Sequence, residues 1–372
     1  MLNEMPLPEI ELTQTEPRTT ETVAAKREKL PSGSQVSAGN ARTLAFLGPF
    51  PAADSEALSM IAHRGESRLY PGGVLPTVKG TEKRLRKLER LDTLDRHKNP
   101  ATGVNHYGIT KNGIAAAWSF GYDMEHASTT HKLSFERLNH YRMIAHVAAQ
   151  LVSPEGYFRG SLGIEPVALD QLWNEKKMRN AFDPIKRMLD EQRKAGQSGS
   201  FAQWRSAKLD HSVAAVKSAI AKAEDDEAKR RIGGLRWSSL VERNPELLTL
   251  GLDETADYSG KSIYQPDLAV IRDQRRGGSR AQNLLIEVEL TKKNWNTYDA
   301  ILSTLSTELQ QPYIYSRAVY FYVGSQIPTL IRKVNAAGEY GLIESGRLVL
   351  IPLTHRDGTE IKLQNRVETG GN

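Results

Sequence analysis

The sequence predicts an α/β protein in which a small helical module with a β-hairpin precedes a larger α/β sheet domain. Three observations lead to this prediction. The chain has 372 residues, which is enough for two domains and a third small one. Residues 41 to 122 follow the order helix, turn, basic helix and hairpin, and residues 263 to 353 follow the order strand, strand, helix, strand, helix, strand.

Composition excludes several classes of protein. The sequence holds no apolar run near the roughly 18 residues that a membrane-spanning helix needs. The segment Met1 to Leu30 is polar and lacks the layout of a signal peptide, so we expect a cytoplasmic protein without a membrane partner. Cysteine is absent, which excludes disulfides, thiolate metal sites and cysteine nucleophiles. The net charge of +6 makes a polyanionic partner plausible.

Residues 1–40 are rich in Glu, Thr, Pro, Ser and Gly and nearly lack aromatic residues. Such a segment buries too little apolar surface to offset its ordering entropy. The sequence therefore predicts a disordered tail over residues 1–40.

The module over residues 41–125 begins with a short helix from Ser55 to His63. A basic helix starts near Thr77, and its apolar face is formed by Val78, Thr81, Leu85 and Leu88. Two short strands, residues 91–97 and 104–110, follow, and a loop with Pro, Asn and Gly joins them as a hairpin.

This order is typical of a winged helix-turn-helix, whose second helix enters the major groove of duplex DNA while the hairpin contacts the flanking backbone. Cationic residues cluster on these two elements, where they would neutralise phosphates. A solvated surface helix is the alternative interpretation. The predicted DNA-binding residues are Lys79, Lys83, Arg84, Arg86, Lys87, Arg90, Arg96 and Lys98.

Residues 126–232 have helical signals throughout, and we interpret them as a helical extension and connector. Leu138, Tyr141, Ile144 and Ala145 supply an apolar helix face, whereas residues 182–231 are dominated by charged residues and Ala. His126, His131, His140 and His146 fall in or near this region without the spacing of a zinc site, so zinc is not predicted.

The last predicted domain, residues 233–372, carries an acidic cluster. Glu287 and Glu289 share one face of a predicted strand, because side chains alternate along a strand, and Asp267 on a neighbouring strand can converge on them. Hard oxygen ligands of this kind suit Mg²⁺ or Mn²⁺. We expect Asp267 and Glu287 to be the residues that bind this ion. Such an ion lowers the pKa of a bound water for attack on phosphorus, and a nearby Lys stabilises the developing charge.

Both halves of the chain resemble one family. The phrase Tyr107-x-Ile109-Thr110-x-x-Gly113, after the basic helix, is similar to the winged-helix half of the replication-relaxation family. Gln265-Pro266-Asp267 followed by Glu287-Val288-Glu289-Leu290-Thr291 is similar to its second half, which resembles the PD-(D/E)xK nucleases. The resemblance implies a DNA-binding protein of a plasmid or mobile element that acts in replication, relaxation or transfer.

One departure from the nuclease motif leaves the activity open. Active members place Lys two residues after the metal-binding Glu, and Glu289 occupies that position here. Lys293 is the best substitute, so the predicted catalytic residues are Asp267, Glu287, Glu289 and Lys293. Three functions remain: a DNA-binding pseudo-nuclease, an active Mg²⁺-dependent DNA endonuclease, and a structural adaptor that recruits a relaxase or replication initiator. Glu242 and the loop residues Arg275, Arg276 and Arg280 are further candidates near this site.

Overall fold

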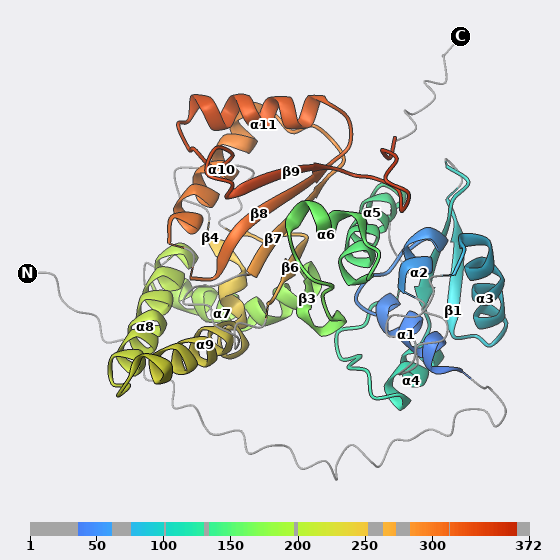
Figure 1. The fold of residues 1–372 in the computed structure, drawn as a ribbon, viewed down its shortest axis with the longest axis horizontal. Coiled ribbons are helices and arrows are strands. Elements are labelled where there is room, and N and C mark those ends of the chain that lie inside the picture. The colour runs from blue at the N-terminus through green and yellow to red at the C-terminus, as the bar shows by residue number, and fades with distance from the viewer. Residues whose placement is uncertain are drawn as a thin grey trace, which may run out of the picture. The chain divides into compact units, whose positions relative to one another are not determined.

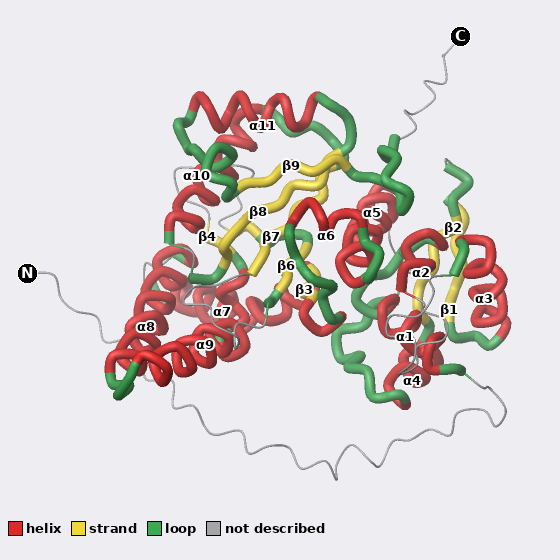
Figure 2. Tube along the Cα trace, viewed as in Figure 1, coloured by secondary structure: helices red, strands yellow, loops and turns green. Residues whose placement is uncertain are grey.

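The centre of the fold is a mixed five-stranded sheet with the order β3-β6-β7-β8-β9 (Figures 1 and 2). The structure is a computed structural model that describes residues 36–61, 76–99, 102–129, 134–196, 200–251, 263–272, 283–311 and 313–362. Its strands are β3 (Leu172–Asn174), β6 (Leu268–Val270), β7 (Asn283–Glu289), β8 (Tyr315–Tyr322) and β9 (Leu348–Pro352). Most of the predicted tail, residues 1–35, lies outside the described residues.

Strands β7, β8 and β9 are parallel to one another. Strand β6 runs antiparallel to β7, and the edge strand β3 runs antiparallel to β6. Two helices make the parallel crossovers: α10 (Trp295–Gln310) joins β7 to β8, and α11 (Gln326–Ala337) joins β8 to β9. The predicted alternation is thus confirmed from β6 onwards, and the protein has a mixed α/β fold. The predicted strand at residues 263–271 is instead divided into two short strands, residues 263–264 and 268–270, which belong to different sheets. Apolar residues from both faces of β7 and β8 are buried, because helices cover both faces of the sheet.

The two faces of the sheet pack against different helices. Leu285, Ala318 and Tyr320 belong to the same buried cluster as the apolar stripe of α10 and α11. Ile286 and Phe321, which point to the opposite face, belong to a cluster with α5 (Phe135–Val152) and α6 (Tyr157–Leu162). The sheet is therefore the middle layer between two helical layers.

The predicted connector contributes directly to this architecture. Its residues form the edge strand β3, which pairs with β6, and the helix α5 that covers one face of the sheet. Helices α7 (Glu175–Lys194), α8 (Phe201–Ala221) and α9 (Asp226–Arg243) follow, and Met178, Val213 and Trp237 join the second buried cluster. Two short 3₁₀ helices (Leu169–Gln171 and Pro245–Leu248) and the strand pair β4 (Leu250–Gly251) and β5 (Ile263–Tyr264) complete this part.

The front module has the expected order of a short helix, a basic helix and a hairpin. The helices α2 (Ser55–Ile61) and α3 (Val78–Arg90) precede the antiparallel strands β1 (Leu94–Lys98) and β2 (Asn105–Ile109). Thr77 caps α3, because its hydroxyl accepts a hydrogen bond from the Gly80 amide at 3.1 Å. Two further helices, α1 (Ala38–Leu47) and α4 (Lys111–Ser119), pack in the same module, and α1 begins inside the segment predicted as a tail.

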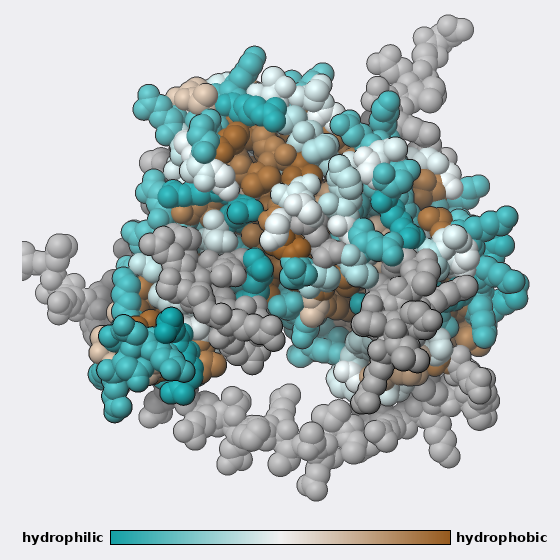
Figure 3. Space-filling model, viewed as in Figure 1, coloured by the Kyte–Doolittle hydropathy of each residue, from teal (hydrophilic) through white to brown (hydrophobic). Residues whose placement is uncertain are grey.

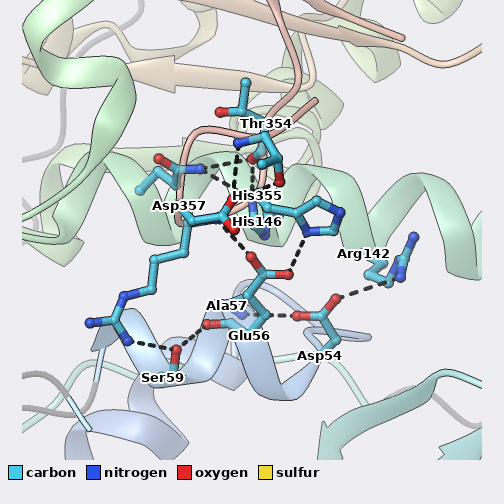
Figure 4. A network of polar contacts seen from close by, with 12 residues as sticks. Asp54, Glu56, Ala57, Ser59, Arg142, His146, Thr354, His355 and Asp357 are labelled. Atoms are coloured by element: carbon cyan, nitrogen blue, oxygen red, sulfur yellow. Dashed lines mark hydrogen bonds and ion pairs between the residues drawn. The ribbon is translucent and has the colours of Figure 1, made fainter. Parts of the chain in front are cut away.

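A turn near the C-terminal end of the described chain ties the front module to the sheet (Figure 4). The Glu56 carboxylate on α2 accepts hydrogen bonds from His355 Nδ1 at 2.9 Å and from the Arg356 amide at 2.7 Å. On the other side of the turn, His146 of α5 contacts the Thr354 carbonyl at 2.8 Å. The turn that follows β9 therefore links α2 and α5 by polar contacts.

Across the part of the chain that the structure describes, no helix is both long enough and apolar enough to cross a bilayer.

Candidate nucleic-acid interface and acidic centre

Helix α3 presents a cationic face to solvent. Thr81, Leu85 and Leu88 are buried against the front module, as the sequence predicts, whereas Val78 at the helix start is 36% exposed. In Figure 3 hydrophilic residues cover the edge where Figure 1 places α3. The exposed cations recur at helical spacing and share one face; they are Lys79, Lys83, Arg86, Lys87 and Arg90.

Arg84 and Arg96 differ from the other predicted DNA-binding residues. Arg84 is half-buried, and its Nε and Nη2 atoms are shielded from solvent. Arg96 on β1 forms an ion pair with Glu89 of α3, with 3.2 Å between Arg96 Nε and Glu89 Oε1. Lys98 is exposed at the end of β1, and Pro100 and Ala101 of the hairpin loop lie outside the described residues.

We use the name acidic centre for the group formed by Asp267, Glu287, Glu289 and Lys293. Asp267 immediately precedes β6, beside β7. The register Leu268↔Ile286 places Asp267 next to Glu287 on the neighbouring strand. Asp267 Oδ2 accepts a hydrogen bond from the Val288 amide at 2.8 Å, and Asp267 Oδ1 lies 3.0 Å from His140 Nε2 on α5. Burial opposes protonation of His140, but the hydrogen bond to Asp267 and its charge outweigh burial and raise the pKa of His140.

Glu287 is buried with an incompletely satisfied carboxyl group. Its side chain extends from the middle of β7, the residue is 8% exposed, and its Oε1 atom has no hydrogen-bond partner among the described residues. Burial raises the pKa of Glu287 well above its ordinary value, and the charge of Asp267 raises it further. Tyr264 on β5 contacts Glu287, and the Tyr264 hydroxyl lies 3.1 Å from that of Tyr320 on β8.

Glu289 and Lys293 form an ion pair at the end of β7. The Lys293 ammonium donates to Glu289 Oε2, and it lies 5.9 Å from the centre of the Tyr298 ring. Burial lowers the pKa of Lys293, but the charges of Glu289 and Glu287 outweigh burial and raise it. Burial raises the pKa of Glu289, and Lys293 offsets this only in part. The Lys293 ammonium therefore lies beside Glu289 in the acidic centre, whereas Lys292 is exposed.

The acidic centre offers a cation one oxygen without a partner among the described residues, Glu287 Oε1, whereas Asp267 Oδ1 would have to exchange its contact with His140 for the cation. Glu287 Oε1 is buried without a partner, and the nearby charge of Asp267 disfavours ionisation of Glu287. Both features fit a site that a hard cation would complete. Within the described ranges, however, no group of three His, Cys, Asp or Glu side chains is arranged to hold a metal ion. A cation would thus take two carboxylates from the protein and its remaining ligands from water.

The acidic centre also contains residues that the sequence does not reveal. His140 and Tyr264 contact Asp267 and Glu287, but no spacing motif links them to these acids. Glu242, in contrast, is exposed on α9, apart from the buried environment of Glu287 and Glu289. Arg275, Arg276, Arg280 and His131 lie outside the described residues.

Comparison with known proteins adds no relative: no family model, no curated protein and no solved structure matches the chain. The local chemistry of these two sites is therefore the basis for assigning a function.

Proposed function

We propose that this chain is a DNA-binding protein that contacts duplex DNA through the exposed cationic face of α3. The single observation that carries the proposal is the placement of Lys79, Lys83, Arg86, Lys87 and Arg90 on one solvent-facing side of a helix whose other side is buried. Neutralising several phosphates and releasing their counterions supplies most of the affinity of such a surface.

The elements around α3 support a winged-helix arrangement. A short helix precedes α3, and the hairpin β1–β2 follows it with Lys98 exposed at the end of β1. In such modules the second helix enters the major groove and the hairpin reaches the flanking backbone. The resemblance of both halves of the sequence to the replication-relaxation family suggests that the DNA belongs to a plasmid or mobile element. The protein would then act in the replication, relaxation or transfer of that DNA.

Charge reversal on α3 tests DNA binding. The double variant Lys83→Glu with Lys87→Glu removes two cations from the exposed face and leaves the buried Leu85 and Leu88 unchanged. We expect a large loss of affinity for duplex DNA, measured by fluorescence anisotropy. The matched control reverses Arg332 and Lys333, two exposed cations on α11. Equal binding by both double variants would refute the proposal.

A second candidate function, metal-dependent cleavage of DNA, is favoured by the convergence of Asp267, Glu287 and Lys293. In this candidate a Mg²⁺ or Mn²⁺ ion would be held by Asp267 and Glu287 and would supply an activated water. Lys293 would stabilise the charge that develops on the phosphate, although its pairing with Glu289 must loosen for this role. A pseudo-nuclease or an adaptor for a relaxase or replication initiator would keep the site without cleavage.

Metal titration separates these alternatives. If the acidic centre binds a cation, Mg²⁺ or Mn²⁺ raises the melting temperature with the logarithm of its concentration, because the ion binds the folded state. Asp267→Asn abolishes that shift, whereas Glu242→Gln, at an exposed position of α9, leaves it unchanged. Incubation with supercoiled and linear DNA then assigns the activity. Cleavage that Asp267→Asn removes supports an endonuclease, and a thermal shift without cleavage supports a pseudo-nuclease.

A further inference from the structure

A pocket of about 350 Å³ opens beside the acidic centre, and Asp267 lines it. Its walls come from segments far apart in the sequence: Phe50 in the turn before α2, Tyr141 on α5, and Lys176 and Arg179 on the first turns of α7. The volume lies at the lower end of the range for small-molecule sites, so it accommodates one nucleotide unit and excludes a duplex.

Polar contacts hold the rim of this pocket in place. The Asn174 side chain caps α7 by accepting from the Lys177 amide at 2.8 Å, and it donates to the Pro49 carbonyl. Lys176 Nζ donates to the Ala127 carbonyl at 3.0 Å and to Ser128 Oγ at 2.8 Å. These contacts join the start of α7 to the turn at Pro49 and to the loop at Ala127 and Ser128, so hydrogen bonds within the protein hold this side of the pocket.

The walls combine two kinds of chemistry. Tyr141 is a half-buried aromatic side chain, and Lys176 and Arg179 are exposed cations. Glu175 pairs with Arg179, and Asp267 adds a second carboxylate, so the pocket carries balanced charge and does not select a bare anion. A nucleotide matches this combination, because its flat base stacks on an aromatic ring while its phosphate contacts cations.

We propose that this pocket holds one unpaired nucleotide of a DNA strand whose backbone passes the acidic centre. The inference rests on the proposed function and adds to it a substrate class, single-stranded or locally opened DNA. Asp267 belongs both to the pocket wall and to the acidic centre, so a nucleotide in the pocket brings an adjoining phosphodiester towards Asp267 and Glu287. The α3 surface binds the neighbouring duplex independently of this step.

The test measures binding of a labelled single strand of about ten nucleotides, which places one nucleotide in the pocket and leaves unpaired nucleotides on either side, and of a duplex. The assay uses the full chain without divalent metal. Tyr141→Leu removes the ring on which the base stacks. We expect this variant to bind the single strand about fivefold or more weakly than wild type does. Tyr141→Phe is the matched control, because it keeps the ring and therefore the affinity. Arg179→Gln weakens single-strand binding, whereas Lys333→Gln, at an exposed position of α11, does not.

The outcomes separate this inference from the proposed function. Loss of single-strand binding in Tyr141→Leu, with duplex affinity and melting temperature retained, supports the pocket. Duplex binding by the wild type without single-strand binding overturns the inference and leaves the proposed function standing. Failure to bind either DNA refutes both. Displacement of the strand by an equal nucleotide concentration of free nucleoside monophosphate also overturns the inference, because the site would then take a free nucleotide.

Discussion

His140 and Asp267 lie 127 positions apart in the sequence, yet His140 Nε2 and Asp267 Oδ1 are 3.0 Å apart. This contact joins α5, which covers one face of the sheet, to the first residue of the acidic centre. Asp267 thereby has a partner for each of its carboxylate oxygens, since Oδ2 accepts from the Val288 amide. The layer between the front module and the sheet therefore helps to position the acidic centre.

The His140–Asp267 contact makes stability depend on pH. The pKa of His140 is raised in the folded protein by the hydrogen bond to Asp267 and its charge, against the effect of burial. A group of this kind stabilises the fold fully below its unfolded pKa of about 6.5 and loses that contribution as the pH rises through the folded pKa. We expect the difference in unfolding free energy between wild type and His140→Ala to decrease as the pH rises through the pKa of His140 in the folded protein. Urea denaturation at several pH values measures it, and a constant difference would contradict the prediction.

Glu287→Gln is expected to stabilise the metal-free protein at neutral pH. Burial and the charge of Asp267 raise the pKa of Glu287 in the folded state, so the fold favours the protonated carboxyl group. The contribution of protonated Glu287 to the free energy of unfolding is fully present below the unfolded pKa of about 4.3. It is lost as the pH rises through the pKa of Glu287 in the folded protein. Glutamine does not ionise and avoids that loss.

Melting temperatures of Glu287→Gln and wild type, measured from acidic to neutral pH, check this expectation. The difference in melting temperature between Glu287→Gln and wild type should increase as the pH rises above about 4.3. Glu242→Gln is the surface control, since Glu242 is exposed on α9. A variant at position 287 that is less stable than wild type at neutral pH would show that ionised Glu287 has a stabilising partner.

The buried pair Arg205–Glu308 fixes α8 to α10. The guanidinium donates to both carboxylate oxygens, at 2.8 and 3.1 Å, and also to the Leu247 carbonyl. Arg205→Ala leaves Glu308 buried without its partner, which costs about 3–5 kcal/mol of unfolding free energy. The double change Arg205→Met with Glu308→Leu should cost less than Arg205→Ala alone, because no charge is left unpaired. Chemical denaturation measures both, and a larger loss in the double variant would contradict this account.

The sequence predicts the sheet domain well where burial is visible in the pattern. The apolar run at residues 318–323 became the buried strand β8, and the spacing of Tyr298, Ile301, Leu302 and Leu305 became the buried face of α10. Glu287 and Glu289 share a face because side chains alternate along β7, and this brings them to Asp267 and Lys293.

Other features have no local signal in the sequence. The sequence does not indicate helix α1, because residues on nearly all its sides are buried and its apolar residues therefore form no stripe; among them are Leu44, Ala45, Phe46 and Leu47. Strand β3 is only three residues long and pairs with a strand almost a hundred residues later. His140 reaches the acidic centre only through the packing of α5 on the sheet, which a reading of neighbouring residues does not reveal.

The salt dependence of duplex binding tests the central claim, that the exposed face of α3 neutralises DNA phosphates. The measurement is the slope of log affinity against log salt concentration for wild type, Lys83→Gln, Lys87→Gln and the α11 control Lys333→Gln. Each lost phosphate contact should make the slope shallower by about 0.9 and lower the affinity for all duplex sequences alike. We expect this change in both α3 variants and not in Lys333→Gln. Wild-type slopes and affinities in both α3 variants would contradict the account.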